Sequence, residues 1–318
     1  MNVVPKRSAE IQFGLAFNWQ YDAEFIRALD KSCHQAGIST YVVGAHNLQQ
    51  TCLEIQNDER RFRWFLDRAS DEDKHFLQLN GLLQSKGTRF LNAHDRYLRA
   101  SDKAEIHTDL LTSGLRLPLT IVLPALDRQP DISPRLIEGF AKPFVVKPAR
   151  GGGGRGVITG GTRIEDVARA RTSHRDQRFL LQQSIEPQIL DGRRAWFRVY
   201  FVCGTVIPCW WDDRTHRYAV FTPGDAKLVN VGELERIVRV IAEVAHLDFF
   251  STEVALDLHS RYVVVDYVNT PCDMRVQSKH FNGVPDTIVH QIIAAITGHL
   301  KSQLAASSAD ASDAHLWP

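Results

Sequence analysis

Short apolar runs and amphipathic stretches alternate over the first hundred residues of the chain. The apolar run at 11–17 is typical of a strand, and the following stretch, 22–35, places apolar side chains at helical spacing. A second apolar run at 39–43 completes a βαβ opening, which favours a parallel sheet. Weaker strands are predicted at 63–66 and 89–91, with a helix at 71–84. We therefore expect an N-terminal open parallel-sheet domain over residues 1–100.

The rest of the chain predicts two smaller α+β modules, which makes the fold class α/β. The first, over residues 101–185, has predicted helices at 101–113 and 164–171, an extended segment at 118–122, and strands at 144–147, 157–159 and 179–183. The second, over 186–303, has two β-rich runs within 196–211, an amphipathic helix at 233–246, strands at 253–258 and 262–268, and a helix at 284–300. The tail over 304–318 is rich in Ala, Ser and Asp, and we expect it to be disordered.

Composition narrows the class of protein. The 318 residues suit one to three domains, and 44% apolar with 24% charged residues is ordinary for a globular protein. A net charge of +1 argues against bulk nucleic-acid or membrane-surface binding. The five cysteines form no CxxC pair, so reduced thiols in the cytoplasm are expected. The first residues are too polar for a signal peptide, and no apolar run is long enough to span a bilayer.

A glycine run is the most distinctive local feature. Gly151 to Gly154 follow a predicted strand that ends at Lys147, and Arg155 comes directly after them. Successive glycines let backbone N–H groups approach an anion with no Cβ in the way, and a lysine supplies a point charge to phosphate oxygens. A flexible hairpin tip is the alternative, but it leaves the two flanking cations unexplained.

Two rival motifs fit this region less well. The glycines match GxGxxG, but that motif should open a helix, and a strand is predicted after Gly156. The residues His174-Arg175-Asp176 match the HRD of protein kinases, but the kinase lysine follows its glycine loop, whereas Lys147 precedes it here. The asparagine and DFG of kinases are missing, and so is a Walker motif. We predict that the HRD tripeptide is a solvated turn.

Four segments within residues 101–275 form a set in chain order. They are Asp102-Lys103 with Gly114 and Pro118; Lys147-Pro148 with the glycine run; Leu180-Leu181-Gln182-Gln183-Ser184-Ile185-Glu186; and Glu253 to Asp257 with Val263 to Asn269. This set resembles the ATP-grasp superfamily, and particularly its carboxylate–amine ligases such as D-alanine–D-alanine ligase. The resemblance implies an ATP-grasp fold with ATP bound between the second and third modules.

The resemblance also implies a role for each segment. Lys103 and Lys147 would reach ATP phosphates. The implied phosphate lid is Gly152, Gly153, Gly154 and Arg155; the implied adenine hinge is Gln182, Gln183 and Ile185, with Glu186 near the ribose; and the implied metal ligands are Glu253, Asp266 and Asn269. The ion would be Mg²⁺, with Mn²⁺ as the alternative.

The chemistry of the acids supports a magnesium site independently. Magnesium prefers a few hard oxygen ligands together with substrate phosphates. Glu253 and Asp266 lie on neighbouring predicted strands, where alternation can place both on one face. Ordinary exposed hairpin acids are the alternative, but Asp266 is embedded among valines and Tyr267, where an unpartnered carboxylate would be costly.

The sequence departs from the family pattern at this point. Two residues, Tyr267 and Val268, separate Asp266 from Asn269, where the family has one, and the acid is aspartate rather than glutamate. A β-bulge could absorb the extra residue. The stretch 271–275 replaces the usual proline–glycine turn, which leaves the substrate class open.

Further candidates lie outside the four segments. In the resembling ligases an arginine at the position of Arg198 faces the phosphate or acyl phosphate, and Arg275 could hold a carboxylate. A surface arginine is the alternative for both. Lys279 and His280 are weaker candidates. We interpret Trp210-Trp211 mainly as core packing. The segment 17–22 follows the first strand, where substrate contact and helix capping by Asp22 are both open.

The expected activity is ATP- and magnesium-dependent joining of a carboxylate to an amine through an acyl phosphate. Phosphoryl transfer depends mainly on positioning and electrostatics, so no dedicated nucleophile is needed. A small-molecule kinase on the same fold stays open, as does a non-catalytic nucleotide-binding subunit. The expected partners are ATP and small substrates, without nucleic acid or membrane, and a homodimer is left open.

Overall fold

The computed structural model describes residues 9–313, with side chains through residue 306. The chain forms two compact units. Unit 1 comprises Met1–His94, Val202–Ile207 and Pro271–Pro318, and unit 2 comprises Asp95–Phe201 and Pro208–Thr270. Unit 1 is therefore built from three separate segments of the chain. The division into modules at residues 100 and 185 stays a prediction.

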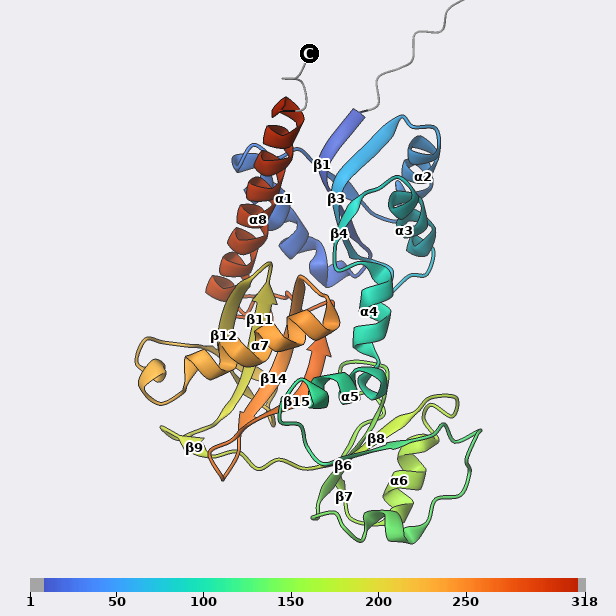
Figure 1. The fold of residues 1–318 in the computed structure, drawn as a ribbon, viewed down its shortest axis with the longest axis vertical. Coiled ribbons are helices and arrows are strands. Elements are labelled where there is room, and N and C mark those ends of the chain that lie inside the picture. Colours follow the sequence, from blue (N-terminus) through green and yellow to red (C-terminus); the bar gives the residue numbers. More distant parts are fainter. Residues whose placement is uncertain (1–8, 314–318) are drawn as a thin grey trace, which may run out of the picture. The chain divides into compact units, whose positions relative to one another are not determined.

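Unit 1 contains the open parallel sheet expected from the first hundred residues. Its strands are β1 (Ala9–Phe17), β2 (Thr40–Val43), β3 (Arg60–Arg68) and β4 (Arg89–Leu91), in the order β2-β1-β3-β4 with parallel pairing throughout. Its helices are α1 (Ala23–Gln35), α2 (Leu48–Gln56), α3 (Phe76–Ser85) and α8 (Asp286–Asp313), with a 3₁₀ turn η1 (Gln20–Asp22). The ribbon of this unit places α1 and α8 on one face of the sheet and α2 and α3 on the other (Figure 1).

Apolar spacing explains the core of unit 1. Phe62 and Phe65 of β3 pack with Ile55 of α2 and with Phe76 and Leu79 of α3. All five side chains are buried. The helix predicted at 71–84 is thus observed as α3, and burial of its apolar side against the sheet stabilises both elements.

The chain end differs from the expectation. Disorder was expected from residue 304, but α8 continues to Asp313. Leu304 is buried within it. Alanine is the best helix former, so an Ala-rich sequence of low complexity extends a helix that is already packed. Residues 314–318 lie outside the described part of the chain.

Unit 2 begins with helices and a four-stranded antiparallel sheet. The helices are α4 (His94–Ser101), whose first residue belongs to unit 1, α5 (Lys103–Thr112) and α6 (Ile164–Arg171), with a 3₁₀ turn η2 (Pro134–Ile137). The strands are β5 (Thr120–Leu123), β6 (Phe144–Pro148), β7 (Ile158–Gly161) and β8 (Phe179–Gln183), in the order β5-β8-β6-β7. Phe144, Val146 and Phe179 of the sheet pack against Val167 of α6.

The second sheet carries the paired acids. Its strands are β11 (Trp196–Val202), β12 (Thr205–Asp212), β13 (Arg217–Val220), β14 (Phe249–Leu256) and β15 (Tyr262–Asn269), in the order β13-β12-β11-β14-β15. Nearby elements are the short hairpin β9 (Ile189–Leu190) and β10 (Arg193–Arg194), the turn η3 (Asp225–Lys227) and α7 (Val231–Ala245). Trp210 and Trp211 are buried in β12, which confirms their packing role.

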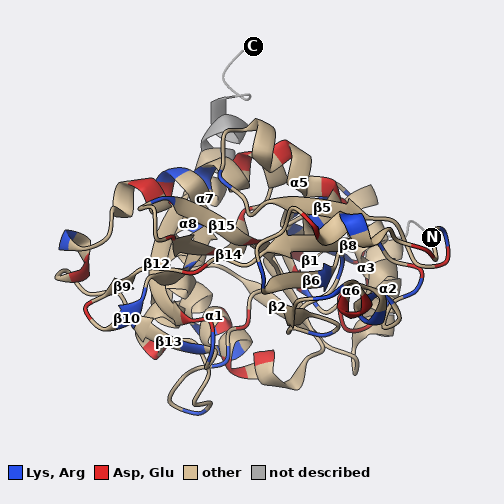
Figure 2. Ribbon diagram, turned by 90° about the horizontal axis from the view of Figure 1, so that it is seen from below, with Lys and Arg blue, Asp and Glu red and all other residues tan. Residues whose placement is uncertain are grey.

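Charge is mixed along the elements. Figure 2 shows acidic and basic residues interspersed, for example along α7, where glutamates and arginines share the helix. Within the part of the chain that the structure describes, no helix is both long enough and apolar enough to cross a bilayer. The cytoplasmic location and the lack of a nucleic-acid partner stay predictions.

Candidate functional site

Glu253 and Asp266 face each other across two antiparallel strands. They are direct partners in the pairing of β14 with β15. The register then passes to Val254 opposite Val264, so Val265 is an additional residue on β15. A bulge of this kind redirects the neighbouring side chains and opens the hydrogen-bond ladder.

A second shift on the other side of Asp266 absorbs the residue that departs from the family pattern. Asn269 pairs with Ser251, so three steps along β15 match two steps along β14. Tyr267 and Val268 are both buried, whereas Asp266 and Asn269 are only partly buried. The expected bulge is therefore present, and it turns both intervening side chains into the protein.

Two lysines from distant parts of the chain converge on Asp266. Lys103 Nζ lies 3.6 Å and Lys147 Nζ 3.9 Å from Asp266 Oδ1. Lys147 Nζ donates to the carbonyl of the bulged Val265 at 2.9 Å, and Lys103 Nζ donates to the carbonyl of Gly151 at 3.2 Å. Both lysines are buried. A pair of cations against one carboxylate leaves a local positive charge that suits an anionic ligand.

Local structure explains how Lys103 reaches this position. It is the first residue of α5, and the Asp102 carboxylate caps the helix by accepting from the N–H of Ala104 at 3.1 Å. The N–H of Lys103 donates to the carbonyl of Ala149, just beyond β6, at 2.8 Å. The start of α5 is thereby fixed beside the strand end that carries Lys147.

The electrostatic environment shifts the pKa values of two of these groups, Asp266 and Lys147. Burial alone would raise the pKa of Asp266, but the charges of Lys103, Lys147 and Arg198 outweigh it and hold that pKa below its usual value. Burial lowers the pKa of Lys147 to about 8, although Asp266 opposes the change. Lys147 therefore loses its proton far more readily than an exposed lysine.

Arg198 lies beside Glu253 on the neighbouring strand β11. Its guanidinium forms a salt bridge with Oε1 of Glu253, and the indole N–H of Trp196 donates to Oε2 at 3.1 Å. Arg198 also lies over the ring of Trp211 at 4.6 Å. Both carboxylates of the candidate site are thus paired with cations.

Solved structures resemble most of the chain, although no protein-family model and no curated protein sequence matches it. The RimK domain protein ATP-grasp from Sphaerobacter thermophilus DSM 20745 is 18% identical with a TM-score of 0.62, covering 92% of this chain and 98% of that chain. The ATP-grasp ligase PsnB, complexed with minimal precursor, Mg and ADP, is 13% identical with a TM-score of 0.61, covering 91% and 98%. D-cycloserine synthetase DcsG is 15% identical with a TM-score of 0.60, covering 92% and 100%.

The chain has the ATP-grasp fold. This confirms the fold expected from the four sequence segments. At identities below 20% the likeness carries no substrate with it, and the narrower resemblance to D-alanine–D-alanine ligase stays a prediction.

The glycine run of this ATP-grasp chain forms an exposed turn between β6 and β7. Gly151, Gly153 and Gly154 have positive φ angles of 124°, 63° and 71°, and Gly152 does not. Arg155, which follows them, is also exposed. Strand β7 follows the glycines, as expected, so the dinucleotide motif is excluded here. The tripeptide at 174–176 is an irregular, largely exposed turn, which confirms the prediction made for it.

The proposed adenine hinge leaves strand β8. Gln182 is buried, and the N–H of Gln183 donates to the carbonyl of Leu119 at 2.9 Å. Ile185 and Glu186 follow the strand without regular structure. Arg194 donates to the Glu186 carboxylate at 2.7 Å, which offsets the negative charge of that group. The hinge and ribose roles stay proposals.

Arg275 belongs to unit 1, whereas the lysines and acids belong to unit 2. Its guanidinium donates to both carboxylate oxygens of Asp273, to Oδ1 at 3.0 Å and to Oδ2 at 2.6 Å. The same guanidinium lies 5.8 Å from the ring of Trp19, in the loop after β1. In this unit His280 contacts Tyr21, and Lys279 forms an ion pair with Glu24. The segment 17–22 and the residues near 275 thus come together within unit 1.

The prediction that the Asp22 side chain caps α1 was wrong. Its side chain makes no capping bond, and Arg68 holds the carboxylate bidentately at 2.7 and 2.9 Å. The same Arg68 donates to the carbonyl of Cys272 at 2.7 Å. Asp22 is buried, so a fixed cation stabilises it more than the helix N–H groups would.

The donor set fits a hard cation. Among residues 9–313 no group of three His, Cys, Asp or Glu is placed to hold a metal ion. Glu253, Asp266 and Asn269 nevertheless offer carboxylate and amide oxygens on one strand pair. Magnesium commonly takes only one or two protein carboxylates and completes its shell with phosphate and water. These residues therefore fit magnesium bound together with a nucleotide.

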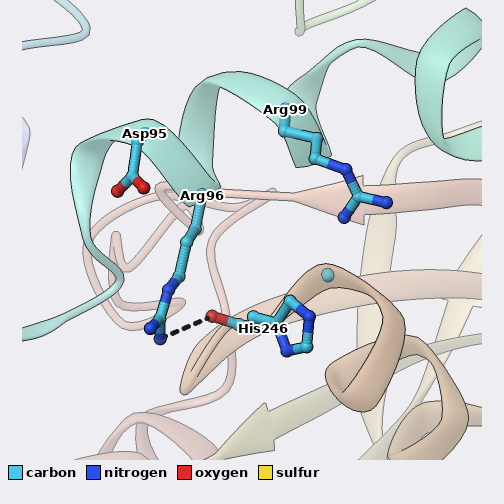
Figure 3. Close-up of a pocket in the computed structure, with 5 residues that line it drawn as sticks. Asp95, Arg96, Arg99 and His246 are labelled. Atoms are coloured by element: carbon cyan, nitrogen blue, oxygen red, sulfur yellow. Dashed lines mark hydrogen bonds between the residues drawn. The ribbon is translucent and has the colours of Figure 1, made fainter.

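A hollow of about 370 Å³ lies elsewhere in unit 2, lined by Asp95, Arg96, Arg99, Ala245 and His246. Figure 3 shows Arg96 directed at the carbonyl of His246, at 3.4 Å. Arg99 donates to the carbonyl of Val244 at 2.8 Å. These arginines satisfy carbonyls at the end of α7, which is a structural role.

Proposed function

We propose that this chain is an ATP-dependent ligase that joins a carboxylate to an amine and releases ADP and phosphate. The observation that carries the proposal is the convergence of Lys103 and Lys147 on Asp266. The two lysines come from a helix and a strand of an ATP-grasp fold, and both face a strand pair with suitable magnesium ligands. Such a constellation suits a triphosphate, whose charge must be neutralised before it can react.

Each residue has a role in the proposed reaction. Lys103 and Lys147 neutralise phosphate oxygens, and the glycine turn with Arg155 covers them. Gln183 and Ile185 offer backbone groups to the adenine, and Glu186 lies toward the ribose. Glu253, Asp266 and Asn269 would hold magnesium, which would supply positive charge against the charge that develops on the phosphate.

The chemistry needs no protein nucleophile. A substrate carboxylate oxygen attacks the γ-phosphorus, the bond from that phosphorus to the β–γ bridging oxygen breaks, and ADP leaves. Arg198, which pairs with Glu253 in this structure, is the cation closest to the acids and suits the oxygens of the acyl phosphate. The amine then attacks the acyl carbon, loses a proton, and phosphate leaves. We propose Arg275 for the substrate carboxylate, in competition with Asp273.

A screen of carboxylates and amines with ATP and magnesium tests the proposal. A ligase forms ADP only when both substrates are present, whereas a kinase on the same fold forms ADP without an amine. Asp266→Asn should abolish turnover while the protein stays folded, because it removes a carboxylate ligand of the proposed magnesium ion. Asp127→Asn is a matched control, since Asp127 pairs only with Arg175 on the surface. AMP as product, or full turnover by Asp266→Asn, contradicts the proposal.

A further inference from the structure

Tyr267 is the side chain that the departure from the family pattern introduces next to Asp266. Its ring is completely buried. Its hydroxyl lies 2.8 Å from Gln182 Nε2 and 2.6 Å from His107 Nδ1. Burial of a phenol lowers the stability of the fold unless its hydroxyl forms hydrogen bonds, and here the hydroxyl has two partners.

The chemistry of the partners fixes the direction of these bonds. An amide nitrogen only donates, so Gln182 Nε2 gives one hydrogen to Tyr267 and the other to Thr120 Oγ1 at 2.9 Å. The Tyr267 hydroxyl then donates its own hydrogen to Nδ1 of a neutral His107. Burial, followed by the charge of Lys147, lowers the pKa of His107, which favours that neutral form.

Each partner sits on an element that carries a residue of the candidate site. Gln182 belongs to β8, which leads into the proposed hinge. His107 lies one turn beyond Lys103 on α5, and residues four apart share one face of a helix. Lys147 Nζ lies 5.4 Å above the Tyr267 ring, within the range of a cation–π contact.

We propose that Tyr267 is a positioning residue that sets the geometry of the nucleotide site. Through its hydroxyl it fixes α5, and with it Lys103, relative to the hinge strand β8. Through its ring it supports Lys147, and through the backbone it is joined to Asp266. The proposal rests on the nucleotide-binding role given above, but it is independent of which substrates are ligated.

Nucleotide affinity is the measurement that isolates this role. Tyr267→Phe keeps the ring and removes the hydroxyl, leaving Gln182 and His107 each with an unmade bond. Calorimetric titration with Mg²⁺ and AMPPNP should show about ten-fold weaker binding, which corresponds to about 1.4 kcal/mol. Tyr262→Phe is the matched control on the same strand. The Tyr262 hydroxyl accepts from the N–H of Asn230, outside the candidate site, so nucleotide affinity should stay unchanged.

Variants of His107 test the direction of the hydrogen bonds that run from Gln182 through Tyr267 to His107. They do not depend on the stability of Tyr267→Phe. His107→Asn offers an acceptor near the position of Nδ1 and should retain most of the affinity. His107→Ala should weaken binding as Tyr267→Phe does, and the double variant should lose little more. A purely structural role would lower the melting temperature of these variants without this pattern in affinity.

The outcomes separate the two proposals. Wild-type protein that binds AMPPNP but ligates nothing refutes the ligase and leaves the positioning role intact. Unchanged affinity in Tyr267→Phe, in a titration where Lys147→Ala loses binding, refutes the positioning role alone. Equal losses in Tyr267→Phe and Tyr262→Phe also refute it, because they indicate general destabilisation. Failure of the wild type to bind AMPPNP refutes both.

Discussion

At the scale of single residues, the site is a set of charges arranged for an anion. Arg198 and Glu253 compensate each other, while Asp266 faces both Lys103 and Lys147. The cluster therefore has an excess positive charge in a largely buried setting, where electrostatic interactions are stronger than in water. A triphosphate would supply the missing negative charge.

The lowered pKa of Lys147 predicts how ATP use depends on pH. Lys147 carries its charge below about pH 8 and loses it above, because burial disfavours the charged form. The value of kcat/KM for ATP, which reports on the free protein, should fall up to ten-fold per unit above that pH. Lys147→Arg should remove this alkaline fall, since a guanidinium stays protonated. A profile that is flat from pH 7 to 10 in the wild type contradicts the assignment.

The sequence predicted the charged residues of the candidate site but not the side chains that support them. Lys103, Lys147, Glu253 and Asp266 were predicted from motif and spacing, and the structure brings them together. The pairing of Asp22 with Arg68 could not be predicted from the sequence, because the two residues lie 46 positions apart and are brought together only by folding of the sheet. The hydroxyl contacts of Tyr267 were missed for the same reason, although its place as the extra residue after Asp266 was a signal.

At the scale of elements, the turn between β6 and β7 should act as a phosphate lid. It is exposed, and a Cβ built at any of Gly151 to Gly154 meets open space, so little holds the turn without a ligand. Amide hydrogen exchange in this turn should slow when ATP and magnesium are added. Gly153→Ala should weaken ATP use, because its φ of 63° disfavours a side chain. Gly152→Ala is the control, since Gly152 does not have a positive φ. Exchange that ATP leaves unchanged argues against a lid.

The apolar pattern predicted most strands and helices, and the exceptions have physical causes. Helix α2 was missed because its buried side chains include Thr51 and Cys52, which give a weak apolar pattern. Helix α4 was missed because it buries only Ala100, and its arginines hold it to the end of α7. The bulges around Asp266 were anticipated only because two residues stand where one was expected.

At the scale of the whole molecule, the units are built from segments that are far apart in the sequence. Unit 1 takes in the residues after Pro271 as well as the N-terminal sheet, so Arg275 and Trp19 are neighbours although 256 positions separate them. Linear patterns predict elements, but such long-range closure depends on tertiary packing. The ATP-grasp fold was predictable because its motifs occur in a fixed order along the chain.

The affinity for ATP with magnesium in Lys103→Ala, Lys147→Ala and the double variant decides whether two lysines bind one triphosphate. A charge-assisted hydrogen bond contributes about 1.5–3 kcal/mol, so each single change should weaken binding about ten- to a hundred-fold. Because both lysines face one ligand and share Asp266, the double variant should depart from additivity. Wild-type affinity in Lys103→Ala, alongside a loss in Lys147→Ala, would contradict the two-lysine site.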